Sequence, residues 1–319
     1  MSATEIEGEA EAVRAAENLC ASCGVAEVDN IIKLEDCDGC DLVKYCSDKC
    51  REDHREQHDE ECKKRAAKLH DKKLFTQPDS SCFGECPICF LPMPLVNQKI
   101  RLFSCCSKTI CDGCDHVHRI SNKQQNCPFC REPVPDREHS KKRKMKRIKA
   151  GDPVAMVDIG QYLSKEGDYN GAVQYFTKAA ELGDVEAHYE LALMYEKGKG
   201  VEKDEGKAVY LYERAAIGGD PYARNNLGCI EEENGRFDRA VKHFVIAANL
   251  GNEESMRALW GHYKQGLISK EDLEATLRAH QAAVDAMKSP ERAAAAAHHN
   301  KKSHKVMQDK NGDRKMSRM

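Results

Sequence analysis

The clearest pattern of apolar and polar positions lies in the C-terminal half of the 319-residue chain, where apolar side chains recur three and four positions apart. This spacing is typical of amphipathic helices with one buried face. Two such stripes are Ala172, Tyr175, Phe176 and Ala179, and Ala208, Leu211, Tyr212 and Ala215. We therefore interpret these aromatic side chains as helix core and not as a ligand-binding box.

The helical pattern also repeats along the chain. A Gly-Asp or Gly-Asn pair recurs at steps of 32, 36 and 32 residues, beginning at Gly151, Gly183, Gly219 and Gly251. Alanine pairs stand shortly before three of these glycines, where small side chains let neighbouring helices approach and the glycine ends the helix. Each step is predicted to be a helical hairpin, and the hairpins should stack into a curved solenoid whose concave side docks proteins.

The remaining composition indicates several small units. Only 40% of the chain is hydrophobic and 32% is charged. The formal net charge of -3 disfavours a strong overall electrostatic field that would attract nucleic acid. The first residues, Met1 to Ala12, are acidic and have no apolar run, so we expect neither a secretory signal nor a membrane segment. The expected location is intracellular, in the cytoplasm, the nucleus or both.

Cysteine usage points to metal. Sixteen of the seventeen cysteines lie between Cys20 and Cys130, and a reducing compartment would not preserve them as disulfides. The first cluster offers eight ligands, enough for two tetrahedral zinc sites: Cys20, Cys23, Cys37, Cys40, Cys46, Cys50, His58 and Cys62. On a helix, Cys46 with Cys50 and His58 with Cys62 would each share a face and hold separate ions. His54 lies one turn from Cys50 and from His58 and is an alternative ligand.

This first cluster, with Tyr45-Cys46-Ser47 at its centre, resembles a MYND finger from Cys20 to Cys62. The resemblance implies that Cys20, Cys23, Cys46 and Cys50 bind one zinc and that Cys37, Cys40, His58 and Cys62 bind the other. It also implies a peptide ligand, since the family has a groove for proline-rich peptides. Two departures are the long loop between Cys23 and Cys37 and Arg55, which stands where a tryptophan is common.

A second set of eight cysteines follows: Cys86, Cys89, Cys105, Cys106, Cys111, Cys114, Cys127 and Cys130. The Cys86-Pro-Ile-Cys start and the Cys127-Pro-Phe-Cys-Arg finish resemble an all-cysteine RING finger spanning Cys86 to Pro133. That family's cross-bracing implies one zinc on Cys86, Cys89, Cys111 and Cys114 and another on Cys105, Cys106, Cys127 and Cys130. Adjacent Cys105 and Cys106 can serve one ion only in a tight turn. Without that turn, Cys82 or His116 would supply the missing ligand.

The RING resemblance further implies roles for three residues. Ile88 and Pro128 match positions that dock a ubiquitin-conjugating enzyme, and Arg131 matches the linking arginine that contacts that enzyme and ubiquitin. Zinc-bound thiolates cannot attack a substrate, so no covalent catalytic residue is expected and such a module acts by positioning. Whether the chain is an enzyme therefore stays open.

The pattern defines six segments: an acidic segment 1–18, the MYND-type finger 19–63, the RING-type finger 82–134, a basic linker helix 138–150, repeats 151–290 and a tail 291–319. The repeats resemble Sel-one-like repeats, relatives of the tetratricopeptide family. The basic run is also typical of a nuclear localisation patch. We expect a disordered basic tail, in which His298, His299 and His304 could bind metal but are more simply solvated. The fold class is mainly α, with two small cross-braced zinc modules before an α-helical solenoid.

The leading hypothesis is a RING-type ubiquitin-protein ligase with four zinc ions, which recruits a conjugating enzyme through the RING and protein partners through the repeats and the MYND finger. The alternative is a non-catalytic zinc-finger adaptor. A MYND-bearing lysine methyltransferase is disfavoured because the repeats occupy the region where its catalytic domain would lie. We predict no membrane partner, and the basic run lacks interleaved aromatics for nucleic-acid stacking.

Overall fold

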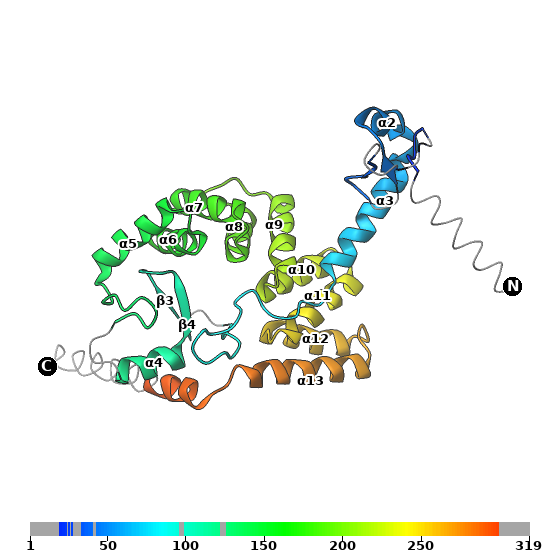
Figure 1. Cartoon of the computed structure of the whole chain (residues 1–319). Helices are drawn as coiled ribbons and strands as arrows, with labels where there is room; N and C mark the ends of the chain where they lie inside the picture. Colours follow the sequence, from blue (N-terminus) through cyan, green and yellow to red (C-terminus); the bar gives the residue numbers. More distant parts are fainter. Residues whose placement is uncertain are drawn as a thin grey trace. The chain divides into compact units, whose positions relative to one another are not determined.

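The computed structural model describes residues 19–23, 25, 27, 33–40, 43–95, 99–121 and 126–299. The chain divides into two compact units, Met1–Thr76 and Gln77–Met319 (Figure 1). The predicted acidic segment 1–18 and the part of the predicted tail from 300 to 319 lie outside the described residues. No helix in the described ranges is both long enough and apolar enough to cross a membrane.

The first unit is a small hairpin followed by two helices. Strand β1 (Glu35–Asp36) pairs antiparallel with β2 (Lys44–Tyr45), and α2 (Asp48–Asp53) and α3 (Arg55–Leu74) follow. The Ser47 hydroxyl accepts a hydrogen bond from the backbone N–H of Cys50 at 3.3 Å, which starts α2. The core cluster of this unit contains Cys20, Leu34 and Tyr45. So small an apolar core needs additional cross-links, and bound metal is the expected source.

The second unit begins with a compact module built on a β-hairpin. Strand β3 (Ile100–Phe103) pairs antiparallel with β4 (Lys108–Cys111), with Ile100 opposite Cys111, and α4 (Asp112–Ser121) follows directly. Its core joins apolar side chains to cysteines, namely Cys86, Met93, Phe103, Ile110, Cys111 and Cys127. Cys86, Cys111 and Cys127 are therefore part of the core packing.

Helix α5 (Arg137–Lys149) covers the basic run. The Asp136 side chain caps its first turn, Met145 and Ile148 are half-buried, and Lys144 pairs with Asp158 of the next helix. The run is thus a helix packed on the repeats, as the simpler interpretation of the sequence expects.

Eight further helices form the repeat solenoid: α6 (Pro153–Glu166), α7 (Tyr169–Glu181), α8 (Val185–Lys197), α9 (Glu205–Ile217), α10 (Pro221–Glu233), α11 (Phe237–Asn249), α12 (Glu253–Lys264) and α13 (Lys270–Ala286). The repeated pair has two roles. Its glycine takes a left-handed conformation, with φ of 84° at Gly183 and 91° at Gly219. The next residue, for example Asp184 or Asp220, then caps the following helix with its side chain.

The hairpin module lies inside the curve of the solenoid. Figure 1 shows helices α5 to α13 as an arc with β3, β4 and α4 on its inner side. Cys82 N–H donates to the carbonyl of Gly219 at 3.0 Å, and the Tyr222 hydroxyl donates to the carbonyl of Leu95 at 2.5 Å. The sequence predicts that the concave side binds partner proteins. In the structure, this side is partly covered by the chain's own zinc-type module (residues 82–134).

A final helix covers residues 290–299. The sequence expectation placed a disordered tail from residue 291, and for 291–299 that expectation is wrong. Ser289 and Pro290 form a helix start, with the Ser289 hydroxyl accepting from the backbone N–H of Arg292 at 3.2 Å, and an alanine run continues it. Ala295 is completely buried and Arg292 is 8% exposed, so the segment packs despite its polar composition.

Candidate functional site

The first unit brings the eight expected ligands into two groups, in each of which the ligand atoms lie within 4.8 Å of one another. Their members are Cys20, Cys23, Cys46 and Cys50, and Cys37, Cys40, His58 and Cys62. In the first group, the sulfur of Cys46 lies 3.6 Å from those of Cys23 and Cys50. In the second, Cys37 and Cys62 are 3.7 Å apart at sulfur, and Cys40 Sγ is 3.2 Å from His58 Nε2.

His54, the alternative ligand, lies outside both groups. Its Nδ1 is 3.1 Å from the Tyr45 hydroxyl, and its ring stacks on that of His58 with 5.7 Å between centroids. These contacts orient the His58 ring, which faces Cys40. His54 therefore supports a ligand and is not one itself.

The second module also brings its eight cysteines into two groups: Cys86, Cys89, Cys111 and Cys114, and Cys105, Cys106, Cys127 and Cys130. The pairs of the two groups alternate along the chain: Cys105 and Cys106 lie between the two pairs of the first group, and Cys111 and Cys114 lie between the two pairs of the second. Sulfurs of Cys89 and Cys111 are 3.9 Å apart, and those of Cys105 and Cys130 are 3.3 Å apart. This is the cross-braced arrangement that the resemblance implied.

The tight turn required for adjacent ligands is present between β3 and β4. Backbone N–H groups of Cys106 and Ser107 both donate to the carbonyl of Phe103, at 3.2 and 2.8 Å, and Ser107 has a φ of 54°. The alternative ligands lie elsewhere. Cys82 lies beside Asp220, where burial strongly raises the pKa of its thiol, and the His116 ring packs on that of His298.

The donor sets fit zinc. Sulfurs bound at about 2.3 Å to a tetrahedral zinc lie roughly 3.8 Å from one another. The shortest sulfur pairs lie between 3.3 and 3.9 Å, and all ligand atoms of a group lie within 4.8 Å of one another. Burial opposes ionisation of the Cys86 thiol, but the backbone N–H groups of Cys111 and Cys89 outweigh it and lower the pKa to about 7. Four protein ligands in each group leave no open coordination position, so these are structural sites and not catalytic ones.

Residues with predicted contact roles lie around this second module. Ile88 is 41% exposed, Arg131 is exposed and Pro128 is half-buried. Phe90 is 72% exposed, and Val117 and Ile120 of α4 are exposed as well. The sequence reasoning missed these last three side chains. For Val117 and Ile120 the signal is an apolar pair three positions apart on an otherwise polar helix, which marks one helix face.

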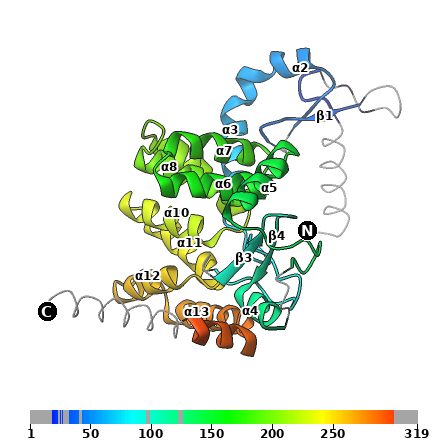
Figure 2. The same ribbon diagram turned by 90° about the vertical axis from the view of Figure 1, so that its left-hand side faces the viewer.

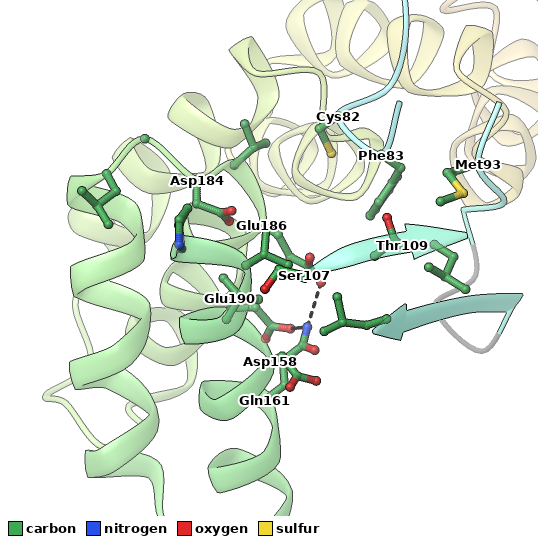
Figure 3. A pocket seen from close by; sticks show the side chains of 18 of the residues that line it. Cys82, Phe83, Met93, Ser107, Thr109, Asp158, Gln161, Asp184, Glu186 and Glu190 are labelled. Atoms are coloured by element: carbon green, nitrogen blue, oxygen red, sulfur yellow. Dashed lines mark hydrogen bonds between the residues drawn. The ribbon is translucent and has the colours of Figure 1, made fainter. Parts of the chain in front are cut away.

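A cavity of about 780 Å³ lies between the β3–β4 hairpin and helices α6 and α8 (Figure 3). Its apolar wall includes Phe83 and Met93, and its opposite wall carries carboxylates. The Gln161 amide donates to both Glu186 and Glu190, at 2.8 Å each. Burial raises the pKa of Glu186 to about 7. This part of the concave side stays open beside the zinc-type module.

Comparison with known protein families agrees with parts of this architecture. Residues 20–62 match the MYND finger, residues 185–220 and 221–252 match the Sel1 repeat, and residues 154–182 match the tetratricopeptide repeat. The zinc-finger and repeat interpretations of these segments are therefore confirmed.

Curated relatives are similar over part of their length. The chain is 33% identical over 95 residues to the DAP3-binding cell death enhancer 1 of Rattus norvegicus, covering 29% of this chain and 19% of the relative. It is 27% identical over 166 residues to the Mus musculus protein of that name, covering 40% and 32%. The chain thus spans less than a third of either relative.

Two solved structures are similar to the chain. A Sel1 repeat protein from Oxalobacter formigenes has 30% identity and a TM-score of 0.42, covering 55% of this chain and 72% of that one. The protective antigen c5321 of uropathogenic Escherichia coli has 29% identity and a TM-score of 0.40, covering 46% and 33%.

Fold and sites together define a class of protein, the zinc-finger scaffolds that bind other proteins. This chain carries a MYND finger, four groups suited to zinc and a solenoid of Sel1-type repeats.

Proposed function

We propose that this chain is a RING-type ubiquitin-protein ligase. The observation that carries the proposal is the alternating, cross-braced grouping of the eight cysteines from Cys86 to Cys130, with Ile88 and Arg131 exposed beside them. The loops that hold the two zinc ions present Ile88 and Pro128 to the conjugating enzyme. Arg131 follows the last ligand and can donate to that enzyme and to ubiquitin at once, because its guanidinium is a planar fork of donors.

The proposed mechanism is positional. All eight thiolates of the module are committed to zinc, so the ubiquitin thioester stays on the conjugating enzyme until a substrate amine attacks it. The chain's contribution is to hold the thioester in one reactive pose and to bring the substrate near, which raises the effective concentration of the two reactants. Substrates or partners bind the repeats, including the open cavity, whose carboxylates favour positively charged segments, and the MYND finger.

The second candidate is a non-catalytic adaptor. It is favoured by the three matched family models, which describe a zinc finger and helical repeats. In that case, the exposed apolar residues around Ile88 would dock another protein without ubiquitin transfer.

An autoubiquitination assay with a panel of conjugating enzymes tests the proposal. We expect ubiquitin chains with the zinc-loaded protein, a loss of about tenfold or more in rate for Ile88→Ala and Arg131→Ala, and an intermediate rate for Arg131→Lys. Leu277→Ala and Arg278→Ala, which change an exposed leucine and an exposed arginine on α13, are matched controls and should leave the rate unchanged.

Absence of ubiquitin chains with every conjugating enzyme, from protein that holds four zinc ions, would reject the ligase in favour of the adaptor. Equal losses in the α13 controls would show that the effect of the two substitutions is not specific to the RING-type module.

A further inference from the structure

The helix at residues 290–299 follows the last repeat and returns to the RING-like module, here meaning residues 82–134. Figure 1 and Figure 2 both show this segment, in orange, beside α4. The approach is close: a Cβ atom added to Gly113 of α4 would lie 2.7 Å from the backbone nitrogen of Arg292 and 2.8 Å from its Cγ. One helical turn further, the rings of His116 and His298 are 5.1 Å apart at their centroids.

Arg292 is the anchor of this contact. Its Nη1 donates to the carbonyls of Pro92 and Met287, at 2.8 and 2.6 Å. Its Nη2 donates to the carbonyl of Leu91 at 3.4 Å and to Cys89 Sγ at 3.6 Å. One guanidinium thus joins the end of α13, the loop after the first cysteine pair and a sulfur of a metal group.

The sulfur contact carries the electrostatic argument. Four thiolates around one divalent zinc leave a net charge of about -2, and Cys86 and Cys111 of this group are almost completely buried. A buried negative charge is costly unless a positive group or N–H donors compensate it. Arg292 is itself buried at 8% exposure, and carbonyl oxygens alone would leave its charge uncompensated. Each charge therefore removes a desolvation cost of the other.

We propose that helix 290–299 is a structural part of the RING-like module, in which Arg292 stabilises the zinc-bound form of the Cys86–Cys89–Cys111–Cys114 group. Arg292 acts as a positioning residue, outside the ligand set, that fixes the Cys89 loop and donates to its thiolate. Outer partners of this kind commonly change metal affinity by about 10- to 100-fold. The proposal concerns metal retention, so it stands whether or not the module is a ligase.

The first test measures zinc retention of the full chain against a colorimetric zinc chelator, with total zinc from elemental analysis. Arg292→Ala should weaken the binding of one of the four zinc ions by about tenfold or more and leave the binding of the other three unchanged. Arg292→Lys keeps the charge but not the fork of donors, so it should rescue part of the loss. Arg278→Ala, an exposed arginine on α13, is the matched control and should retain zinc as the wild type does.

A second variant tests the contact without removing any donor. Gly113→Ala should push helix 290–299 away from α4 and weaken the binding of the same single zinc ion, although alanine is normally the better helix residue. Gly261→Ala is its control, because a Cβ at that helical position meets nothing within 4 Å. Circular dichroism of each variant establishes that the repeats remain folded.

Two results would overturn the proposal. One is chelator competition of Arg292→Ala and Gly113→Ala indistinguishable from that of the wild type. The other is an equal loss of affinity for all four zinc ions, because that would mean a general loss of protein stability and not a specific effect on the Cys86 group.

Discussion

At the scale of single residues, the second module is organised by a backbone feature that its cysteine spacing does not reveal. Phe90, Ser107 and Arg131 each follow the second cysteine of a pair, and each has a positive φ, between 54° and 61°. In the Cys86–Cys89 and Cys127–Cys130 pairs, this conformation lets the N–H of Phe90 or Arg131 return to the carbonyl of the first cysteine, at 2.8 or 3.0 Å. A non-glycine residue in this region costs about 1 to 2 kcal/mol.

The positive φ at Arg131 allows the effect of its backbone on stability to be measured separately from the effect of its side chain on activity. We expect Arg131→Gly to be more stable than Arg131→Ala by about 1 kcal/mol, because glycine adopts a positive φ freely. Both variants should be equally defective in any activity that needs the guanidinium. Thermal unfolding of the zinc-loaded proteins, followed by circular dichroism, measures the difference.

The control for this prediction is position 278 in helix α13, where the order should reverse, with glycine less stable than alanine by about 1 kcal/mol. If Arg131→Gly melted at or below Arg131→Ala, the left-handed backbone at Arg131 would not be a source of strain.

At the scale of elements, local signals were enough for the ligand pairs and the helical hairpins. The His58–Cys62 pair depends only on helix geometry, because both residues lie in α3. The expectation that Cys46 shares a helix face with Cys50 is wrong, because α2 begins at Asp48 and Cys46 precedes its cap, Ser47. The Gly-Asp pair at Gly183 contains both the end of one helix and the cap of the next. For the adjacent Cys105 and Cys106, the sequence predicts that a tight turn is required, but no residue pattern shows that the turn forms.

What the sequence could not supply depends on distant contacts. Arg292 bonds the carbonyl of Pro92, 200 positions earlier, and Tyr222 bonds that of Leu95, 127 positions earlier. No periodicity within either segment encodes these pairs. For this reason, the sequence predicts a disordered tail where the helix at 290–299 lies, and it predicts that the inner face of the solenoid is free for partners.

The start of helix α8 gives an element-scale prediction about pH. Burial raises the pKa of Glu186 to about 7, well above its ordinary value of 4.5. The folded state therefore holds more protons than the unfolded state between these values, so its stability falls as pH rises through this window. The full effect amounts to about 3 kcal/mol.

Glu186→Gln removes this dependence because a glutamine stays neutral. The difference in free energy of unfolding between the variant and the wild type should be small near about pH 5 and should favour the variant by up to roughly 3 kcal/mol near pH 8. Denaturant unfolding at the two pH values measures it, and Glu202→Gln, an exposed position, is the control. A pH-independent difference between Glu186→Gln and the wild type would contradict the prediction.

At the scale of the whole second unit, the zinc-type module and the solenoid are one folded body. Phe83 packs edge-on against Tyr222, Cys82 bonds the backbone at Gly219, and Gln77 bonds Asn249 of α11. The contact between Phe83 and Tyr222 covers apolar surface on the inner side of the repeats that would otherwise face water. The stability of the repeats should therefore depend on metal that they do not bind.

Removal of zinc tests this dependence. With excess chelator, the full chain should keep most of its helical signal at low temperature, because helices α6 to α13 contain none of the four metal groups. Its melting midpoint should fall, because the inner face loses its cover when the zinc-type module unfolds.

Tyr222→Phe isolates the coupling, since it deletes only the hydroxyl that donates to Leu95. In the presence of zinc it should cost about 1 kcal/mol, and after chelation it should cost almost nothing, because its partner is no longer in place. A midpoint unaffected by chelation, or a Tyr222→Phe cost that is the same with and without zinc, would mean that the two parts of this unit fold independently.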